Sequence, residues 1–179
     1  MLREIGALDL AISYHEKALS IYPYFEEALI NKGVAFERKA KSTEKKEVFE
    51  ENNDFALKCF EEVIQLNPKN SLAYSNKSVC LSNIGDFSEA LKFVQKALDL
   101  DQKDIKALNQ KAFLLNKMDK KDEALNVIKE AIKIGGRSDY GKNLYRTEAI
   151  IHADRGSHKK AIKIIGKVLE SDKHFLGGL

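Results

Sequence analysis

The chain has 179 residues, of which 44% are hydrophobic and 32% charged, so it can form a buried core and lacks the composition of a disordered chain. Its net charge of +3 is too small to indicate nucleic-acid binding by itself. Two cysteines without metal-ligand spacing, no apolar run near the ~20 residues of a membrane span, and no signal-peptide pattern predict a soluble, cytoplasmic protein with no membrane contact.

A helical pattern begins near the N-terminus and returns four times. Five alanines are each followed, four residues later, by a larger side chain and, three residues after that, by a smaller one. The alanines are Ala11, Ala56, Ala90, Ala124 and Ala161. The larger residues are His15, Phe60, Val94, Ile128 and Ile165. Such spacing places these positions on one face of a helix. The sequence numbers of successive alanines differ by 45, 34, 34 and 37. These intervals indicate a repeat of about 34 residues with two insertions.

A second small residue marks a preceding helix in four of the repeats; it lies about 12 positions before the alanine in three of them and farther away in the repeat that carries the insertion. These small residues are Gly33, Ser78, Ala112 and Ala149. Large residues flank each one at four positions before and three positions after. Small residues let two helices approach closely while large ones fill the space between them, so each repeat is predicted to be a pair of packed helices.

A helix pair of about 34 residues with this pattern, followed by Pro23 or Pro68 after two of the second helices, resembles the tetratricopeptide repeat. The segments Tyr74-Ser75-Asn76-Lys77 and Gly85-Asp86-Phe87 are especially similar to that family. The resemblance implies an all-α fold, a right-handed solenoid of antiparallel helix pairs whose first helices line a concave groove. It also implies a protein-binding module rather than an enzyme.

The whole chain, 1–179, is predicted to be a single array of such repeats. Its parts are a partial repeat at 1–25, with the end of one first helix and a complete second helix, four full repeats at 26–70, 71–104, 105–138 and 139–174, and a tail at 175–179. The repeat at 26–70 carries an 11-residue insertion at about 38–52. Eleven residues make three helical turns, so we predict that the insertion extends the second helix, which would start near Ser42 or Thr43 with Glu44. The three extra residues of the last interval are assigned to the Gly135-Gly136 turn.

Both ends of the array lack a polar capping helix, which solenoids need for solubility. We therefore expect either a segment of a longer array or uncapped ends that pair between copies as a homo-oligomer.

No catalytic or metal site is predicted. The histidines His15, His152 and His158 occupy large-residue core slots, no ligands converge at metal-binding spacing, and no nucleophile or phosphate loop has a motif. No cofactor is expected.

The predicted binding site lies on the first helices. Asn31, Asn76 and Gln110 each stand two residues before the small residue, followed by Thr147 in the last repeat. Planar amides in register can pair with the backbone of an extended peptide, and the slot is similar to the asparagine ladder in the repeats of O-linked N-acetylglucosamine transferase. One residue after the small residue comes an apolar stripe for ligand side chains. The predicted groove residues are Asn31, Val34, Asn76, Val79, Lys106, Gln110, Phe113 and Ile150.

Three alternatives stay open. The carboxylate clamp of chaperone-binding relatives would use Asn76 and Lys106, but Ile30, Val34 and Gln110 stand in its other three slots. A self-associating scaffold would need no separate ligand. An RNA-binding helical repeat would need many phosphate contacts, and the groove offers few cations: Arg38, Lys106, Lys117 and Arg146.

Overall fold

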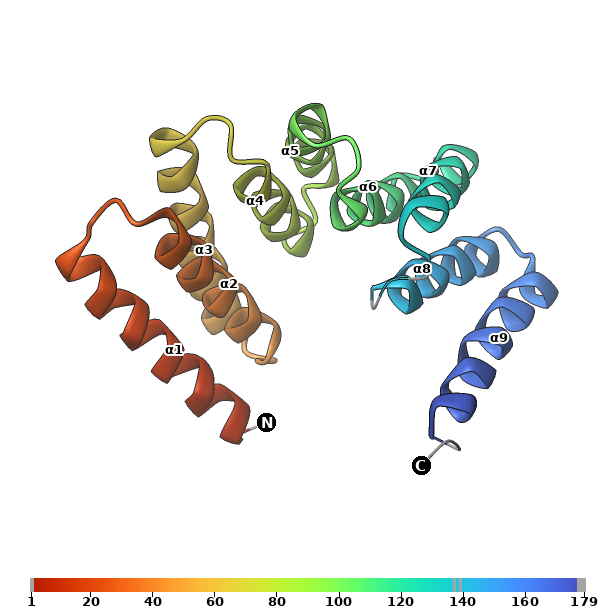
Figure 1. Cartoon of the computed structure of the whole chain (residues 1–179), viewed down its shortest axis with the longest axis horizontal. Helices are drawn as coiled ribbons and strands as arrows, with labels where there is room; N and C mark the ends of the chain where they lie inside the picture. The colour runs from red at the N-terminus through yellow and green to blue at the C-terminus, as the bar shows by residue number, and fades with distance from the viewer. Residues whose placement is uncertain (1, 137, 139, 177–179) are drawn as a thin grey trace. The chain divides into compact units, whose positions relative to one another are not determined.

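The computed structural model describes residues 2–136, 138 and 140–176, with side chains at 6–136, 138, 140–166, 168 and 169. In chain order the helices are α1 (Leu2–Ile21), α2 (Glu26–Lys41), α3 (Lys46–Leu66), α4 (Ser71–Asn83), α5 (Phe87–Leu100), α6 (Ile105–Lys117), α7 (Lys121–Gly135), α8 (Gly141–Asp154) and α9 (His158–Leu176). The described residues contain no strand (Figure 1). The prediction of an all-α fold is confirmed.

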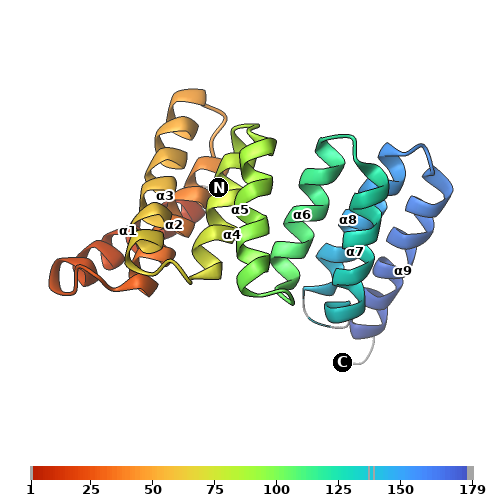
Figure 2. The same cartoon turned by 90° about the horizontal axis from the view of Figure 1, so that it is seen from above.

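The chain forms two compact units, Met1–Asp101 and Gln102–Leu179. In the first unit each helix from α1 to α5 packs against the next, and α2 also contacts α4; in the second unit each helix from α6 to α9 packs against the next, and α6 also contacts α8. Consecutive helices are joined by short turns (Figure 2). We call α2, α4, α6 and α8 the first helices of their repeats, and α1, α3, α5, α7 and α9 the second helices.

The period of the repeat is visible in the helix boundaries. The first helices α4 and α6 begin at Ser71 and Ile105, and the second helices α5 and α7 begin at Phe87 and Lys121, so one full period separates the two starting points of each pair. Side chains of Asn70, Asp86 and Asp104 cap three of these helices by accepting hydrogen bonds from backbone N–H groups of the first turn.

The 11-residue insertion is shared between two helices and the turn that joins them. Helix α2 has 16 residues against 13 in α4, helix α3 has 21 against 14 in α5, and the turn at 42–45 is one residue longer than the turn at 84–86. The second helix takes most of the insertion, as predicted, but it starts at Lys46. Thr43 does not cap it, because the Thr43 hydroxyl accepts a hydrogen bond from the Lys45 backbone N–H at 3.2 Å within the turn.

The three extra residues of the last interval are not confined to the Gly135-Gly136 turn, so that prediction is wrong. Helix α7 has 15 residues against 14 in α5, α8 has 14 against 13 in α6, and the turn at 136–140 is one residue longer than the turn at 101–104. Each element thus takes one residue. A one-residue change at a helix end leaves the packed stripe of that helix in place. The position of each extra residue therefore could not be predicted from the sequence.

The two ends of the predicted map also differ from the structure. The described part of residues 1–25 holds one helix, α1, with no separate end of a first helix before it. Helix α9 reaches Leu176 and so includes two residues of the predicted tail, while 177–179 lie outside the described residues.

The core is built from the small and large residues that define the repeat. A Cβ atom at Gly33 would lie 2.7 and 2.8 Å from two ring atoms of Phe60, so only glycine lets α2 approach α3 this closely. The small residues Ser78, Ala112 and Ala149 and the larger residues Phe60, Val94 and Ile128 are all buried. The sequence pattern and the core therefore coincide.

Lysines stand directly before three of the small residues, and two of them, Lys32 and Lys77, cross to the preceding helix. Lys32 Nζ lies 3.1 Å from Glu16 of α1, and Lys77 Nζ lies 2.7 Å from Glu61 of α3. Lys77 Nζ also lies 4.3 Å from the ring centroid of Phe93. The lysine stems cover apolar surface and their heads join neighbouring repeats, with a modest contribution from each ion pair.

Candidate functional site

The predicted groove residues divide between the two units and are described for each unit separately. In the first unit Asn31 and Val34 lie on α2, and Asn76 and Val79 lie on α4. Members of each pair are three residues apart, which places them on one side of their helix. Because α2 contacts α4, these four residues form one surface, which we call the α2/α4 face.

In the second unit Lys106, Gln110 and Phe113 lie on α6, and Ile150 lies on α8. The three positions on α6 follow each other at four and three residues, so they share one side of the helix. Because α6 contacts α8, these residues form a second surface, which we call the α6/α8 face.

Two of the three predicted amides have an unused hydrogen-bond donor. The Nδ2 atom of Asn76 and the Nε2 atom of Gln110 are buried, and neither has a partner among the described residues. Asn31 is exposed. A buried polar group without a partner costs about 1–3 kcal/mol, and buried donors in proteins almost always have one. Each face therefore holds an amide nitrogen that no described residue satisfies, and an external carbonyl oxygen can reach this buried atom only if the amide side chain turns outward.

The amide series does not continue into the last repeat. Thr147 occupies the corresponding slot on α8, and its hydroxyl donates to the backbone carbonyl of Asn143 at 3.1 Å. That hydroxyl is occupied within its own helix. Thr147 thus contributes less to the α6/α8 face than the sequence pattern indicated.

The predicted apolar residues differ in how much surface they offer. Val34 packs against two core clusters of the first unit, around Leu29 and around Phe60. The ring of Phe113 is half-buried, with Lys117 Nζ 5.4 Å from its centroid. Ile150 is 44% exposed. The α6/α8 face therefore has the larger accessible apolar contribution, from Phe113 and Ile150.

Ile30, one of the positions at which the carboxylate clamp requires a cation, is buried at 8% exposure. Val34, which stands where the clamp requires an asparagine, packs on the core. Neither residue can hold a carboxylate, so the α2 side of a clamp has no charged group to offer.

The histidines and cysteines of the described residues do not form a common metal-ligating cluster. His152 is buried and His15 is half-buried, as predicted for core slots, but His158 is exposed at the start of α9, so its assignment to the core is wrong. Cys59 and Cys80 are buried and free. Burial raises the pKa of Cys59 and raises the pKa of Cys80 to about 12, which keeps both thiols protonated. No cluster of metal-ligating side chains is found in the described part of the chain.

Burial of His152 predicts a pH-dependent stability of the second unit. Burial lowers the pKa of His152 below the value of 6.5 in an unfolded chain; Lys160, Lys129 and Arg155 lower it further and Glu148 opposes them. The unfolded state then binds more protons, so stability falls as the pH drops below about 6.5. We expect His152→Leu, the residue type at Leu81 and Leu115 in the equivalent slots, to remove this part of the pH dependence.

Urea unfolding followed by circular dichroism, on either side of pH 6.5, measures the effect. His158→Leu, at an exposed position, serves as the control. An unchanged pH dependence in His152→Leu would contradict the assignment.

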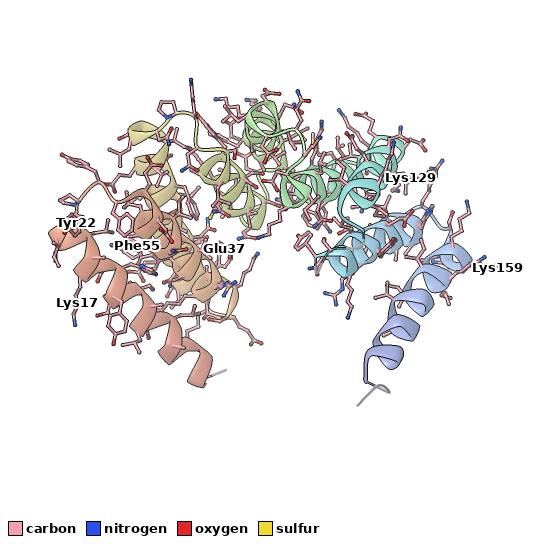
Figure 3. The ribbon with its side chains drawn as sticks, viewed as in Figure 1. Lys17, Tyr22, Glu37, Phe55, Lys129 and Lys159 are labelled. Atoms are coloured by element: carbon pink, nitrogen blue, oxygen red, sulfur yellow. The ribbon has the colours of Figure 1, made fainter. Side chains whose placement is uncertain are left out.

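Two open cavities lie at turns, away from the predicted groove residues. One, of about 540 Å³, is lined by Ile21, Tyr22, Pro23, Tyr24 and Phe25 in the turn between α1 and α2. The other, of about 500 Å³, is lined by Gly156, Ser157, His158, Lys159 and Lys160 in the turn between α8 and α9. Tyr22, labelled in Figure 3, is 67% exposed. In the first of these segments the repeat pattern distinguishes only Pro23, which indicates the end of a helix.

Among the helices of the described residues, none is both long and apolar enough to cross a membrane.

The helix pairs, their regular period and the packing of small against large residues define a helical-repeat fold of the tetratricopeptide type. The model of the family of anaphase-promoting complex, cyclosome, subunit 3 matches residues 50–131. Comparison with curated proteins gives no match.

Solved structures with this fold are similar over most of the chain. MamA is 19% identical, with 98% of this chain and 94% of MamA covered and a TM-score of 0.69. TTC0263, a thermophilic tetratricopeptide protein of Thermus thermophilus, is 16% identical, with 88% and 74% covered and a TM-score of 0.70. YrrB, described as a tetratricopeptide protein with an unusual peptide-binding site, is 19% identical, with 94% and 80% covered and a TM-score of 0.60. The resemblance to the tetratricopeptide repeat is thereby confirmed for the fold.

Proposed function

We propose that this chain is a protein-interaction module that binds an extended peptide segment of a partner along the first helices. The observation that carries the proposal is the pair of buried donors, Asn76 Nδ2 and Gln110 Nε2, that lack a partner in the described residues. Each occupies the same slot of its repeat. A peptide backbone presents carbonyl oxygens at regular intervals whatever its side chains are, so such donors suit a ligand of this kind.

The fold supports the same function. Tetratricopeptide repeats serve as scaffolds for protein interactions, and one of the similar structures, YrrB, is described as having a peptide-binding site. On the α2/α4 face Val79 would receive apolar side chains of a peptide, and Asn31, which is exposed, would add a further amide contact. On the α6/α8 face Phe113 and Ile150 would receive such side chains. Because Val34 packs on the core, its role would be limited to the edge of such a site.

The test is a pull-down with the wild-type chain and with a variant carrying Asn31→Ala, Asn76→Ala and Gln110→Ala. We expect the variant to lose a partner that the wild type retains. Each lost hydrogen bond should weaken the binding free energy by about 1 kcal/mol. A matched variant, Gln65→Ala, Gln102→Ala and Asn126→Ala, removes three exposed amides outside both faces. Equal retention by all three proteins, after their melting curves are shown to agree, would contradict the proposal.

A second candidate function is a self-associating scaffold, favoured by exposed apolar residues on the helices α1 and α9. Leu10, Tyr14 and Ile21 of α1 are 56%, 61% and 69% exposed, and Ile162 and Leu169 of α9 are 72% and 58% exposed. These residues follow helical spacing and would be covered by pairing between copies. Light scattering over a range of protein concentrations tests it: a mass that stays at one chain throughout would exclude self-association.

A further inference from the structure

The α6/α8 face differs from the α2/α4 face in its charge. Helix α6 contains Lys106, Lys111 and Lys117 and no Asp or Glu. Lys106, Gln110, Phe113 and Lys117 follow each other at four, three and four residues, so they form one stripe along α6 with a cation at each end. On α8, Arg146 lies four residues before Ile150 and adds a third cation beside the same apolar pair.

These three cations have no carboxylate partner in the part of the second unit whose side chains are described. Two ion pairs of that part join Lys121 to Asp119 and Arg155 to Asp122, and neither includes one of the three cations. Two carboxylates occur on α8. Asp154 accepts a hydrogen bond from Asn116 Nδ2 at 2.6 Å, and Glu148 acts on the buried His152. Lys106, Lys117 and Arg146 therefore remain available to an external anion.

The first helices of the other unit are different. Their lysines are ion-paired within the unit: Lys32 with Glu16, Lys39 with Asp9, Lys41 with Glu37 and Lys77 with Glu61. Arg38 of α2 is the one cation of these two helices without an ion pair among the described residues. Helix α2 also carries Glu26, Glu27 and Glu37. Figure 3 labels Glu37 on this helix. The α2/α4 face thus has no comparable excess of free positive charge.

We propose that the α6/α8 face selects an acidic peptide segment in which Asp or Glu residues flank apolar side chains. This inference rests on the proposed peptide-binding function and specifies the chemistry of the partner. The carboxylates pair with Lys106, Lys117 and Arg146, and the apolar side chains contact Phe113 and Ile150. The buried Gln110 amide has no partner, and by turning outward it donates from Nε2 to a backbone carbonyl of the peptide. Hydrogen bonds between charged groups are roughly twice as strong as neutral ones, so charge decides which segments bind.

A single-stranded RNA would also bring negative charge, but the face suits it less. Such ligands bind through exposed aromatic rings on which bases stack. The one aromatic side chain of the α6 stripe, Phe113, is half-buried and has Lys117 above its ring. The face therefore favours carboxylates spaced along a peptide over stacked bases.

The test uses a synthetic library of random peptides, acetylated at the N-terminus and amidated at the C-terminus, so that no terminal carboxylate contributes. The full chain retains peptides on a column, and the retained pool is sequenced at low and at high salt. We expect enrichment in Asp and Glu next to Leu, Ile or Phe, and loss of that enrichment at high salt. A representative retained peptide should bind the variant Lys106→Glu, Lys117→Glu, Arg146→Glu at least about tenfold more weakly.

The matched control is Lys129→Glu, Lys133→Glu, Lys163→Glu, which makes the same change in net charge on α7 and α9 and should keep wild-type affinity. Lys129 is labelled in Figure 3 on α7. Lys117 lies in the last turn of α6, where a positive charge favours the helix. If the reversed variant melts below the wild type, the neutral series Lys106→Gln, Lys117→Gln, Arg146→Gln replaces it.

The outcomes separate this inference from the proposed function. A retained pool without acidic preference, or acidic peptides that bind the reversed variant as well as the wild type, would overturn the inference and leave peptide binding intact. A pool with no retained peptide would overturn both. Salt-sensitive binding of a uridine homopolymer that the reversed variant loses would assign the cations to RNA and also overturn the inference.

Discussion

Phe60→Ala is expected to lower the free energy of unfolding of the first unit by about 3–5 kcal/mol, the usual cost of removing a fully buried phenylalanine from a well-packed core. Phe60 is 0% exposed and is the largest fully buried side chain of the described residues. Its ring fills the space that Gly33 leaves open on α2 and packs with Ala56 and Cys80. Alanine would leave a cavity between α2, α3 and α4, because the glycine on the other side cannot fill it.

Urea unfolding followed by circular dichroism at the helix band measures this loss. Phe55→Ala is the matched control on the same helix. Phe55, labelled in Figure 3, is 40% exposed and contacts the ring of Phe36 with 5.1 Å between centroids, so we expect a loss of about 1 kcal/mol. Equal losses in the two variants would mean that Phe60 does not form the centre of this core.

The packing of Phe60 illustrates what the sequence could predict. The pairing of a small residue on a first helix with a large one on a second helix recurs with the period of the helix pair, and a helix has only one face on which this spacing can lie. The core positions follow from that periodicity without further information. The same period also placed Asn76 and Gln110 in one slot of consecutive repeats, on which the candidate site depends.

Other features could not be predicted, because they depend on neighbours distant in sequence or on helix ends. The insertion can be divided between α2, α3 and their turn in many ways that keep the helical stripe in phase, so the stripe does not indicate which division occurs. His158 stands in the slot of Phe87, yet it is exposed. The lack of a partner for the amide nitrogens of Asn76 and Gln110 becomes visible only when the surrounding helices are in place.

The most informative feature that the sequence pattern did not reveal is a buried amide in α3, directly after the inserted residues. Asn53 is 0% exposed and occupies the slot that Phe87 fills in the next repeat. Its Nδ2 atom donates to the backbone carbonyl of Cys80 at 3.3 Å, and its Oδ1 atom has no partner in the described residues. Carbonyl groups in the last turn of a helix lack a partner within the helix, so Asn53 supplies one for the end of α4 from the neighbouring repeat. Two successive asparagines in a helix give no sign of this, because the acceptor lies 27 residues away.

Asn53→Asp is therefore expected to destabilise the first unit strongly at neutral pH. The change keeps the size of the side chain but replaces the donor that faces the Cys80 carbonyl by a carboxylate oxygen. Burial disfavours the charged form and raises the pKa of a buried carboxyl group by several units, and each unit corresponds to about 1.4 kcal/mol. A shift of about three units would cost about 4 kcal/mol, a large part of the stability of a typical domain.

The pH dependence separates this cause from a loss of packing. The pKa of Asp in an unfolded chain is about 3.9, and in this variant the folded-state pKa lies above that value, so the folded state binds more protons. The destabilisation should grow as the pH rises above about 3.9 and should shrink as the pH falls towards it, where the protonated carboxyl can donate to the Cys80 carbonyl in place of the amide. Asn126→Asp on α7, at an exposed helical position, makes the same chemical change and should lose only a few tenths of a kcal/mol. If Asn53→Asp is as stable as Asn126→Asp at neutral pH, the amide is not buried against the end of α4 and its hydrogen bond does not help to join the two repeats.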